Sequence, residues 1–289
     1  IEGNKMSKVT AGGVNARIQA SVLSLYDSTR LKGPKAKGEN TDWEKADSEI
    51  GAKLEEISKE GGAIRILSST IISPSTNAAI AEFISKYPAT KHIPHDAVSY
   101  SAIRKANRNT FGQWMIPTYM FDRANVVVSF AADFLINWLS PVEFSKQYVK
   151  NRKVSKEKKG MSKHVQFETT LSVTGSNADV RVPVKPSEIG ANVVALYNAV
   201  AGASLPVSTK VSDKIGQVAA WLKANKGKSL VVCGVNDPAI QTIVNEINKT
   251  LDNYGNTIDI FNPGMQHAGN DEEFVALVND MKEGKVAAL

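Results

Sequence analysis

The chain has 289 residues, of which 42% are hydrophobic and 22% are charged, values that are ordinary for a globular protein. No apolar run approaches the roughly 18–20 residues of a membrane span, and the single cysteine, Cys233, excludes an internal disulfide or a four-thiolate iron–sulfur cluster within this chain. The net charge of +6 favours an acidic partner or anionic lipid head groups and does not by itself indicate nucleic-acid binding.

The chain opens in the middle of an element. Ile1-Glu2 reads as the end of an extended segment that runs into the Gly3-Asn4 turn. Apolar residues then recur at helical spacing, at Ile18, Val22, Leu25 and Tyr26. Because Gly284–Leu289 also stops where a new apolar run begins, we expect a piece of a larger protein.

Strand and helix patterns alternate along the rest of the chain. Thr41-Asp-Trp-Glu44 is a capping box, and Ser140-Pro-Val-Glu143 places a Ser N-cap before a Pro. The predicted elements are a helix from Thr41 to Gly61-Gly62, a strand over Ala63–Ser69, helices over Ser75–Tyr87 and from Ser140, strands over Asn125–Phe130 and Val165–Thr170, helices over Ser187–Ala201 and Val211–Asn225, a strand over Ser229–Cys233, a helix over Asp237–Leu251, a strand over Thr257–Phe261, a helix over Asp271–Glu283 and a short strand over Val286–Leu289.

This alternation predicts an α/β fold of two doubly wound, Rossmann-like parallel-sheet domains. We expect a connecting segment over residues 1–40, a first domain over 41–190 and a second over 191–289, truncated at its C-terminus. The strands at 63–69 and 125–130 are expected in one sheet. Those at 229–233 and 257–261 are expected in another.

Several motifs resemble the molybdopterin oxidoreductase superfamily. They are the Gly3-Asn4 turn, Gly12-Gly13, Leu25-Tyr26-Asp27 with Arg30-Leu31 and Pro34, Trp43-Glu-Lys-Ala46, and Leu171–Asp179 followed by Val182-Pro-Val-Lys-Pro186. A narrower resemblance is to the molybdopterin oxidoreductase-like part of the iron–sulfur subunit of alternative complex III, a bacterial quinol:electron-acceptor oxidoreductase. It rests on Gln19–Asp27, Phe111-Gly112 with Pro117 and Tyr119, and Ser129–Phe134.

The narrower resemblance implies a cofactor-free structural scaffold in a membrane-bound respiratory complex. Electron transfer would run through iron–sulfur clusters elsewhere in the full-length subunit. The partners would be a quinol-oxidising membrane subunit and cytochrome c subunits, on the periplasmic side of the inner membrane. Two alternatives stay open: a true molybdopterin-dependent oxidoreductase of the polysulfide-reductase type, and an independent small-ligand-binding α/β protein.

The residues that a molybdenum site would use depart from the superfamily pattern. The expected ligand region reads Asp96-Ala-Val-Ser-Tyr-Ser101, in which Ser99 and Ser101 are better interpreted as a helix N-cap than as ligands. The superfamily's cofactor-contacting Pro-Gly-Thr-Asp is Pro186-Ser-Glu-Ile189 here. We therefore expect no catalytic, cofactor-binding or metal-binding residue in this chain.

A second candidate for phosphate binding follows the strand at 229–233. Gly234 stands alone where a dinucleotide fingerprint has three glycines, and Asp237-Pro238 reads as a helix N-cap with Pro in the first turn. Asp133, after the strand at 125–130, falls where a doubly wound sheet faces its ligand. A capping role for Asp133 is equally compatible with the sequence.

The remaining titratable candidates read as structural. His92 and His95 point to opposite faces of an extended segment and have no third metal ligand nearby in the sequence. His164 and His267 are expected at the surface or in loops. Cys233, on an apolar strand, is expected to be an inert buried thiol.

One segment, Lys150–His164, has a strong excess of positive charge. It lacks the interleaved aromatic residues of a nucleic-acid site, so we expect a solvated loop or, as the second possibility, a contact with an acidic partner. The candidate contact residues are Lys150, Arg152, Lys153, Lys156, Lys158, Lys159 and Lys163.

Overall fold

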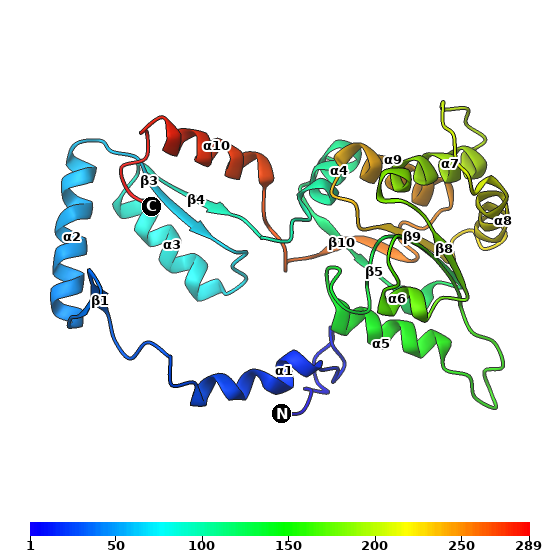
Figure 1. Cartoon of the computed structure of the whole chain (residues 1–289), viewed down its shortest axis with the longest axis horizontal. Helices are drawn as coiled ribbons and strands as arrows, with labels where there is room; N and C mark the ends of the chain where they lie inside the picture. Colours follow the sequence, from blue (N-terminus) through cyan, green and yellow to red (C-terminus); the bar gives the residue numbers. More distant parts are fainter. The chain divides into compact units, whose positions relative to one another are not determined.

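The computed structural model describes all residues from 1 to 289 (Figure 1). Its contacts divide the chain into two compact units. Unit 1 comprises Ile1, Ala16–Ser99 and Ala268–Leu289, and unit 2 comprises Glu2–Asn15 and Tyr100–His267. This grouping differs from the expected ranges 41–190 and 191–289, because residues 2–15 belong to unit 2 and the chain returns to unit 1 at Ala268. No helix is both long enough and apolar enough to cross a bilayer.

Unit 1 is built on a small parallel sheet. Its elements are α1 (Ala16–Ala20), the 3-10 helix η1 (Ser21–Tyr26), β1 (Lys35–Ala36), β2 (Glu39–Asn40), α2 (Trp43–Lys59), β3 (Ile64–Ser68), α3 (Pro74–Lys86), β4 (Thr90–Pro94) and α10 (Asp271–Lys282). β3 and β4 pair in parallel, and Ala288 bridges β3 on its other side. The small core joins Ile57 of α2, Ile64 of β3 and Tyr87 after α3.

Unit 2 is built on a four-stranded parallel sheet in the order β8-β7-β6-β9. Its elements are α4 (Ser101–Phe111), β5 (Ile116–Tyr119), η2 (Phe121–Arg123), β6 (Val126–Phe130), α5 (Pro141–Arg152), β7 (Lys163–Glu168), α6 (Val173–Ser176), β8 (Val180–Pro183), η3 (Pro186–Glu188), α7 (Ile189–Ala201), α8 (Ser212–Lys223), β9 (Ser229–Cys233), α9 (Pro238–Thr250) and β10 (Ile258–Gly264).

The sheet of unit 2 is covered on both faces (Figure 1). Val128 and Phe130 of β6 pack with α7, α8 and α9 in one apolar core. Val127, which precedes Val128 in β6, packs in a second core with α5 and the β5–β10 pair. Burial on both faces explains why every residue of β6 and β9 is buried and most are apolar. The predicted α/β class with parallel sheets is therefore confirmed.

The predicted strand neighbours are wrong. β6 pairs in parallel with β9, not with β3, because β6 and β9 both lie in unit 2 whereas β3 lies in unit 1. β10 pairs antiparallel with β5 and does not join β9. Matching apolar strands fit several sheets equally well, so the pairing depends on where the chain crosses between units.

One predicted cap also differs. The side chain of Asp42, not that of Thr41, accepts a hydrogen bond from the backbone N–H of Lys45 (2.7 Å) and begins α2. Both residue types cap helices well, and the backbone of Asp42 has the extended conformation that an N-cap requires.

Candidate functional site

The carboxyl ends of the parallel strands in unit 2 form the edge where doubly wound folds bind ligands. From β6 the chain adds β7 and β8 on one side of the sheet and then β9 on the other side. The carboxyl ends of β6 and β9 are therefore the topological switch point. We call the loops that follow β6, β7 and β9 the sheet crest. Whether this crest can hold a ligand depends on what its side chains already bind.

After β9, the start of α9 is capped by a carboxylate. Asp237 accepts hydrogen bonds from the backbone N–H groups of Ala239 (2.8 Å) and Ile240 (3.2 Å), which confirms the predicted N-cap. A side chain at Gly234 would overlap the carbonyl oxygen of Ala131. The glycine is therefore required by contact between two loops, and the carboxylate of Asp237 would repel a phosphate from these donors.

After β6, Asp133 connects two loops of the crest. Its carboxylate accepts hydrogen bonds from the hydroxyl and from the backbone N–H (3.3 Å) of Thr174, in α6. Its backbone carbonyl accepts from Ile136, Asn137 and Trp138, which closes a tight turn. Asp133 thus has a structural role that includes capping.

After β7, a buried carboxylate occupies the space beneath α6. Glu168 accepts hydrogen bonds from the Ser172 hydroxyl (2.6 Å) and from Nε of Arg181 (2.6 Å), and its side chain is 5% exposed. A Cβ on Gly175 would overlap this carboxylate. The chain's own side chains therefore fill the crest, and its backbone donors are not directed at a bound phosphate.

The serines of the expected molybdenum-ligand region do not cap a helix. The Ser99 hydroxyl donates to the carboxylate of Asp271 in unit 1 (2.7 Å). α4 begins at Ser101 with Tyr100 in the N-cap position and no side-chain cap. The Asn236 side chain instead accepts from the Ala102 N–H (3.0 Å). The predicted serine N-cap is wrong, because a loop distant in sequence supplies the acceptor.

The histidines are separated in the structure. His92 hydrogen-bonds the Ser68 hydroxyl through Nε2 (2.8 Å), and His95 stacks on Phe274 with ring centroids 3.8 Å apart. No group of three His, Cys, Asp or Glu side chains in the structure is placed to hold a metal ion. His267 lies in the loop after β10, as expected.

His164 contradicts the expectation of a surface position, because it is fully buried on β7. Its Nδ1 lies 3.1 Å from the Tyr148 hydroxyl and its Nε2 lies 3.2 Å from Gln166 Oε1. Burial disfavours the charged imidazolium and lowers the pKa of His164 to about 4. The ring is therefore neutral at pH 7 and serves as a hydrogen-bonded core residue.

Cys233 has the expected environment. It is 1% exposed at the end of β9, and burial raises the pKa of its thiol to about 12. A thiol that stays protonated and covered is neither a nucleophile nor a metal ligand at neutral pH. The position of Cys233 confirms the interpretation of a buried, structural thiol.

Most of the expected partner-contact residues are engaged within the chain. Lys150 pairs with Asp122 (2.8 Å), and Arg152 forms a two-pronged pair with Asp179 (2.8 and 2.9 Å). Lys158 donates to the Asn151 carbonyl (2.9 Å), and Lys163 lies over the Trp221 ring, 3.9 Å from its centroid. The segment also forms the end of α5 and the start of β7. Three of its cations stay exposed without a described partner, namely Lys153, Lys156 and Lys159.

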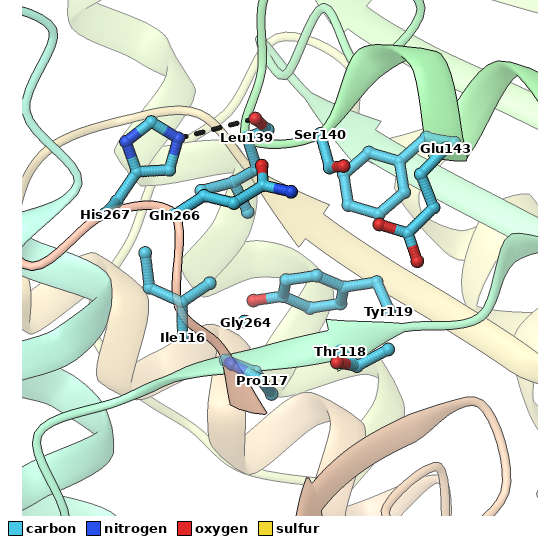
Figure 2. Close-up of a pocket in the computed structure, with 11 residues that line it drawn as sticks. Ile116, Pro117, Thr118, Tyr119, Leu139, Ser140, Glu143, Gly264, Gln266 and His267 are labelled. Atoms are coloured by element: carbon cyan, nitrogen blue, oxygen red, sulfur yellow. Dashed lines mark hydrogen bonds between the residues drawn. The ribbon is translucent and has the colours of Figure 1, made fainter. Parts of the chain in front are cut away.

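Unit 2 also contains a pocket between β5, the start of α5 and the segment after β10 (Figure 2). About 340 Å³ of atom-free space lies between these residues, part of it open to solvent. Tyr119 lies along its floor, with Glu143 on one side and Gln266 and His267 on the other. His267 Nε2 lies 3.4 Å from the Leu139 carbonyl oxygen.

Glu143 provides the carboxyl group that lines this pocket. Burial raises the pKa of its carboxyl group, and the Gln147 amide donates to its Oε1 (3.2 Å). Burial likewise raises the pKa of the Tyr119 hydroxyl. The arrangement can hold a small ligand with an apolar body and one polar group. The sequence marked Glu143 only as a first-turn acid, since nothing local joins it to Tyr119 or His267.

No protein-family model matches the chain, and no curated protein matches it. Among solved structures, acetylene hydratase from Pelobacter acetylenicus is similar in fold, with a TM-score of 0.54 and 11% sequence identity. The similarity covers 79% of this chain and 35% of acetylene hydratase, so the chain spans about a third of that protein. The chain therefore has a mixed α/β fold with parallel sheets, similar to the matched part of acetylene hydratase.

Proposed function

We propose that this chain is the molybdopterin oxidoreductase-like part of the iron–sulfur subunit of alternative complex III, a respiratory quinol:electron-acceptor oxidoreductase. In this role it is a cofactor-free scaffold on the periplasmic side of the membrane. Iron–sulfur clusters outside this chain carry the electrons. A quinol-oxidising membrane subunit and cytochrome c subunits are its partners.

The observation that carries this proposal is the filled sheet crest of unit 2. The carboxylates of Asp133, Glu168 and Asp237 lie at the sheet crest and bind the chain's own donors. A pterin dinucleotide is an anion through its phosphates, and it requires free backbone donors and little nearby negative charge. The crest offers the opposite, while the fold is similar to part of acetylene hydratase.

Metal analysis of the full-length protein tests the proposal. The protein is produced in a host that makes the molybdenum cofactor and is then purified. Inductively coupled plasma mass spectrometry is expected to find no stoichiometric molybdenum or tungsten in it. A bona fide molybdenum enzyme produced in the same host is the control for cofactor supply. Near-stoichiometric metal in this protein would overturn the scaffold role and favour a molybdopterin-dependent enzyme.

A double variant tests the ligand region separately. Ser99→Ala with Ser101→Ala removes the hydroxyl groups nearest the expected ligand position. We expect quinol oxidation by the intact complex to change less than about twofold, since the Ser99 hydroxyl donates to the carboxylate of Asp271. Loss of turnover in a fully assembled complex would show that these hydroxyls take part in the reaction.

The pocket in Figure 2 favours a second candidate function, the binding of a small ligand by unit 2. Its half-buried carboxyl group beside aromatic rings is typical of small-molecule sites. Native mass spectrometry of the purified protein would show a retained ligand as added mass. Glu143→Gln would release that ligand if the pocket holds it, and a mass equal to the chain alone would exclude this candidate.

A further inference from the structure

Residues 16–37 of unit 1, which we call the arm, expose many large apolar side chains. Neither α1 nor η1 contains a buried residue. Leu23 is 68% exposed, Leu25 is 64% exposed and Tyr26 is 86% exposed, and Leu31 beyond the helix is 78% exposed. Several large, exposed apolar side chains within one short segment are typical of an interaction site.

The arm is also strongly basic. It has five basic side chains and one carboxylate, Asp27, and that carboxylate is bound by the hydroxyl (2.7 Å) and the N–H (2.8 Å) of Thr29. No ion pair in the structure involves any of the five, in contrast to Lys150 and Arg152 in the expected contact segment. The five are Arg17, Arg30, Lys32, Lys35 and Lys37.

We propose that the arm docks into an apolar groove rimmed by carboxylates on another protein of the same assembly. The apolar residues of η1 fill the groove, and the cations that follow them pair with the rim. This inference rests on the proposed function only in that the chain works within an assembly. The proposed contact lies at residues 16–37, whereas the sequence alone placed the candidate partner contact in the segment Lys150–His164.

The distribution of charge favours a protein over a lipid surface. Helices that lie in a membrane interface carry Lys and Arg along their polar face and are often 20–30 residues long. The helical part of the arm, Ala16–Tyr26, contains a single cation, Arg17. The other cations follow the helix, toward the short β1–β2 hairpin. A largely apolar helix with most of the cations after its C-terminal end suits a groove with an acidic rim.

Crosslinking of the native assembly tests the contact directly. The assembly with the full-length protein is isolated from its source cells and treated with a water-soluble carbodiimide, which joins amines to carboxylates in contact. We expect crosslinks from Lys32, Lys35 or Lys37 to Asp or Glu residues of one identified subunit. Crosslinks only from residues 150–163, or none from the arm to another protein, would overturn the proposal.

Affinity measurements on that identified subunit, produced separately, give the second test. The triple change Lys32→Glu, Lys35→Glu and Lys37→Glu should weaken binding at least about tenfold, and more salt should weaken binding of the wild type. Leu23→Ser with Tyr26→Ser should weaken it by a similar factor. Because these residues are exposed, circular dichroism should show unchanged folding.

The matched control is the triple change Lys153→Glu, Lys156→Glu and Lys159→Glu, which alters the net charge equally on exposed residues of unit 2. It should leave the affinity within about twofold. An equal loss of affinity in both triple variants would show only a general electrostatic attraction, which depends on net charge, and would overturn a specific arm contact.

Two further measurements test whether the arm instead binds a lipid surface or a second copy of this chain. Binding to vesicles containing phosphatidylserine that the arm variants abolish, without binding to the subunit, would show a lipid contact. A wild-type dimer in sedimentation that the arm variants dissociate would show a second copy of this chain. Either result overturns the proposal, whereas the molybdenum content bears only on the proposed function.

Discussion

Glu168 Oε1 lies 2.6 Å from Nε of Arg181, which joins the end of β7 to its neighbour β8 through a nearly buried ion pair. The charge of Arg181 is the partner that makes burial of the Glu168 carboxylate possible. The hydroxyl and N–H of Ser172 satisfy its remaining acceptor sites. This pair holds the sheet crest in its filled form.

Removing Arg181 should therefore be costly. We expect Arg181→Leu to lower the free energy of unfolding by about 3 kcal/mol, because the carboxylate would stay buried without its opposite charge. Urea unfolding followed by circular dichroism measures the change. Glu49→Ala, which breaks an exposed pair with Lys45, is the control and should cost less than about 1 kcal/mol. Similar effects of the two variants would contradict a structural role for Glu168.

Two glycine variants distinguish close packing from helix propensity. Gly175→Ala should lower the unfolding free energy by about 1–3 kcal/mol, because its new Cβ would overlap the Glu168 carboxylate. Gly216→Ala, in the exposed interior of α8 with open space around it, should instead raise it by about 0.5–1 kcal/mol. Stabilisation by both changes would show that α6 does not pack on Glu168.

Stability should rise with pH as a consequence of the buried His164. Its folded pKa of about 4 lies below the usual histidine value of 6.5, so between these values the unfolded chain binds the extra proton. Stability from the neutral ring is present above about pH 6.5 and is lost as the pH falls through 4. His164→Gln should flatten the dependence between pH 4.5 and 6.5 in urea titrations. An unchanged slope would mean that another group causes it.

Cys233 should resist alkylation in the folded protein. Its pKa of about 12 leaves almost no thiolate at pH 7.5, and the side chain is covered. Iodoacetamide labelling followed by mass spectrometry should show less than about a tenth of the rate found in 8 M urea. Rapid labelling of the native protein would identify an accessible, functional thiol.

Local sequence patterns alone determined most of the elements in this protein. The β-branched run at 126–130 predicts a buried strand, and Asp237-Pro238 predicts the start of α9, because side-chain burial and N–H capping act within a few residues. The thiol of Cys233 follows from the same kind of argument. Each of these features depends on neighbours in the sequence.

Tertiary structure alone decided the partners of those elements. β6 pairs with β9 across about a hundred residues, Asn236 caps α4, and His164 lies in the core although its neighbour Lys163 reaches the surface. The run of positive charge in the segment 150–164 likewise predicted exposed cations that are free to bind a partner. In the structure, Asp122 pairs with Lys150 and Asp179 pairs with Arg152. Periodicity reports how deeply a residue is buried, and not which distant group lies against it, because many pairings bury the same apolar surface equally well.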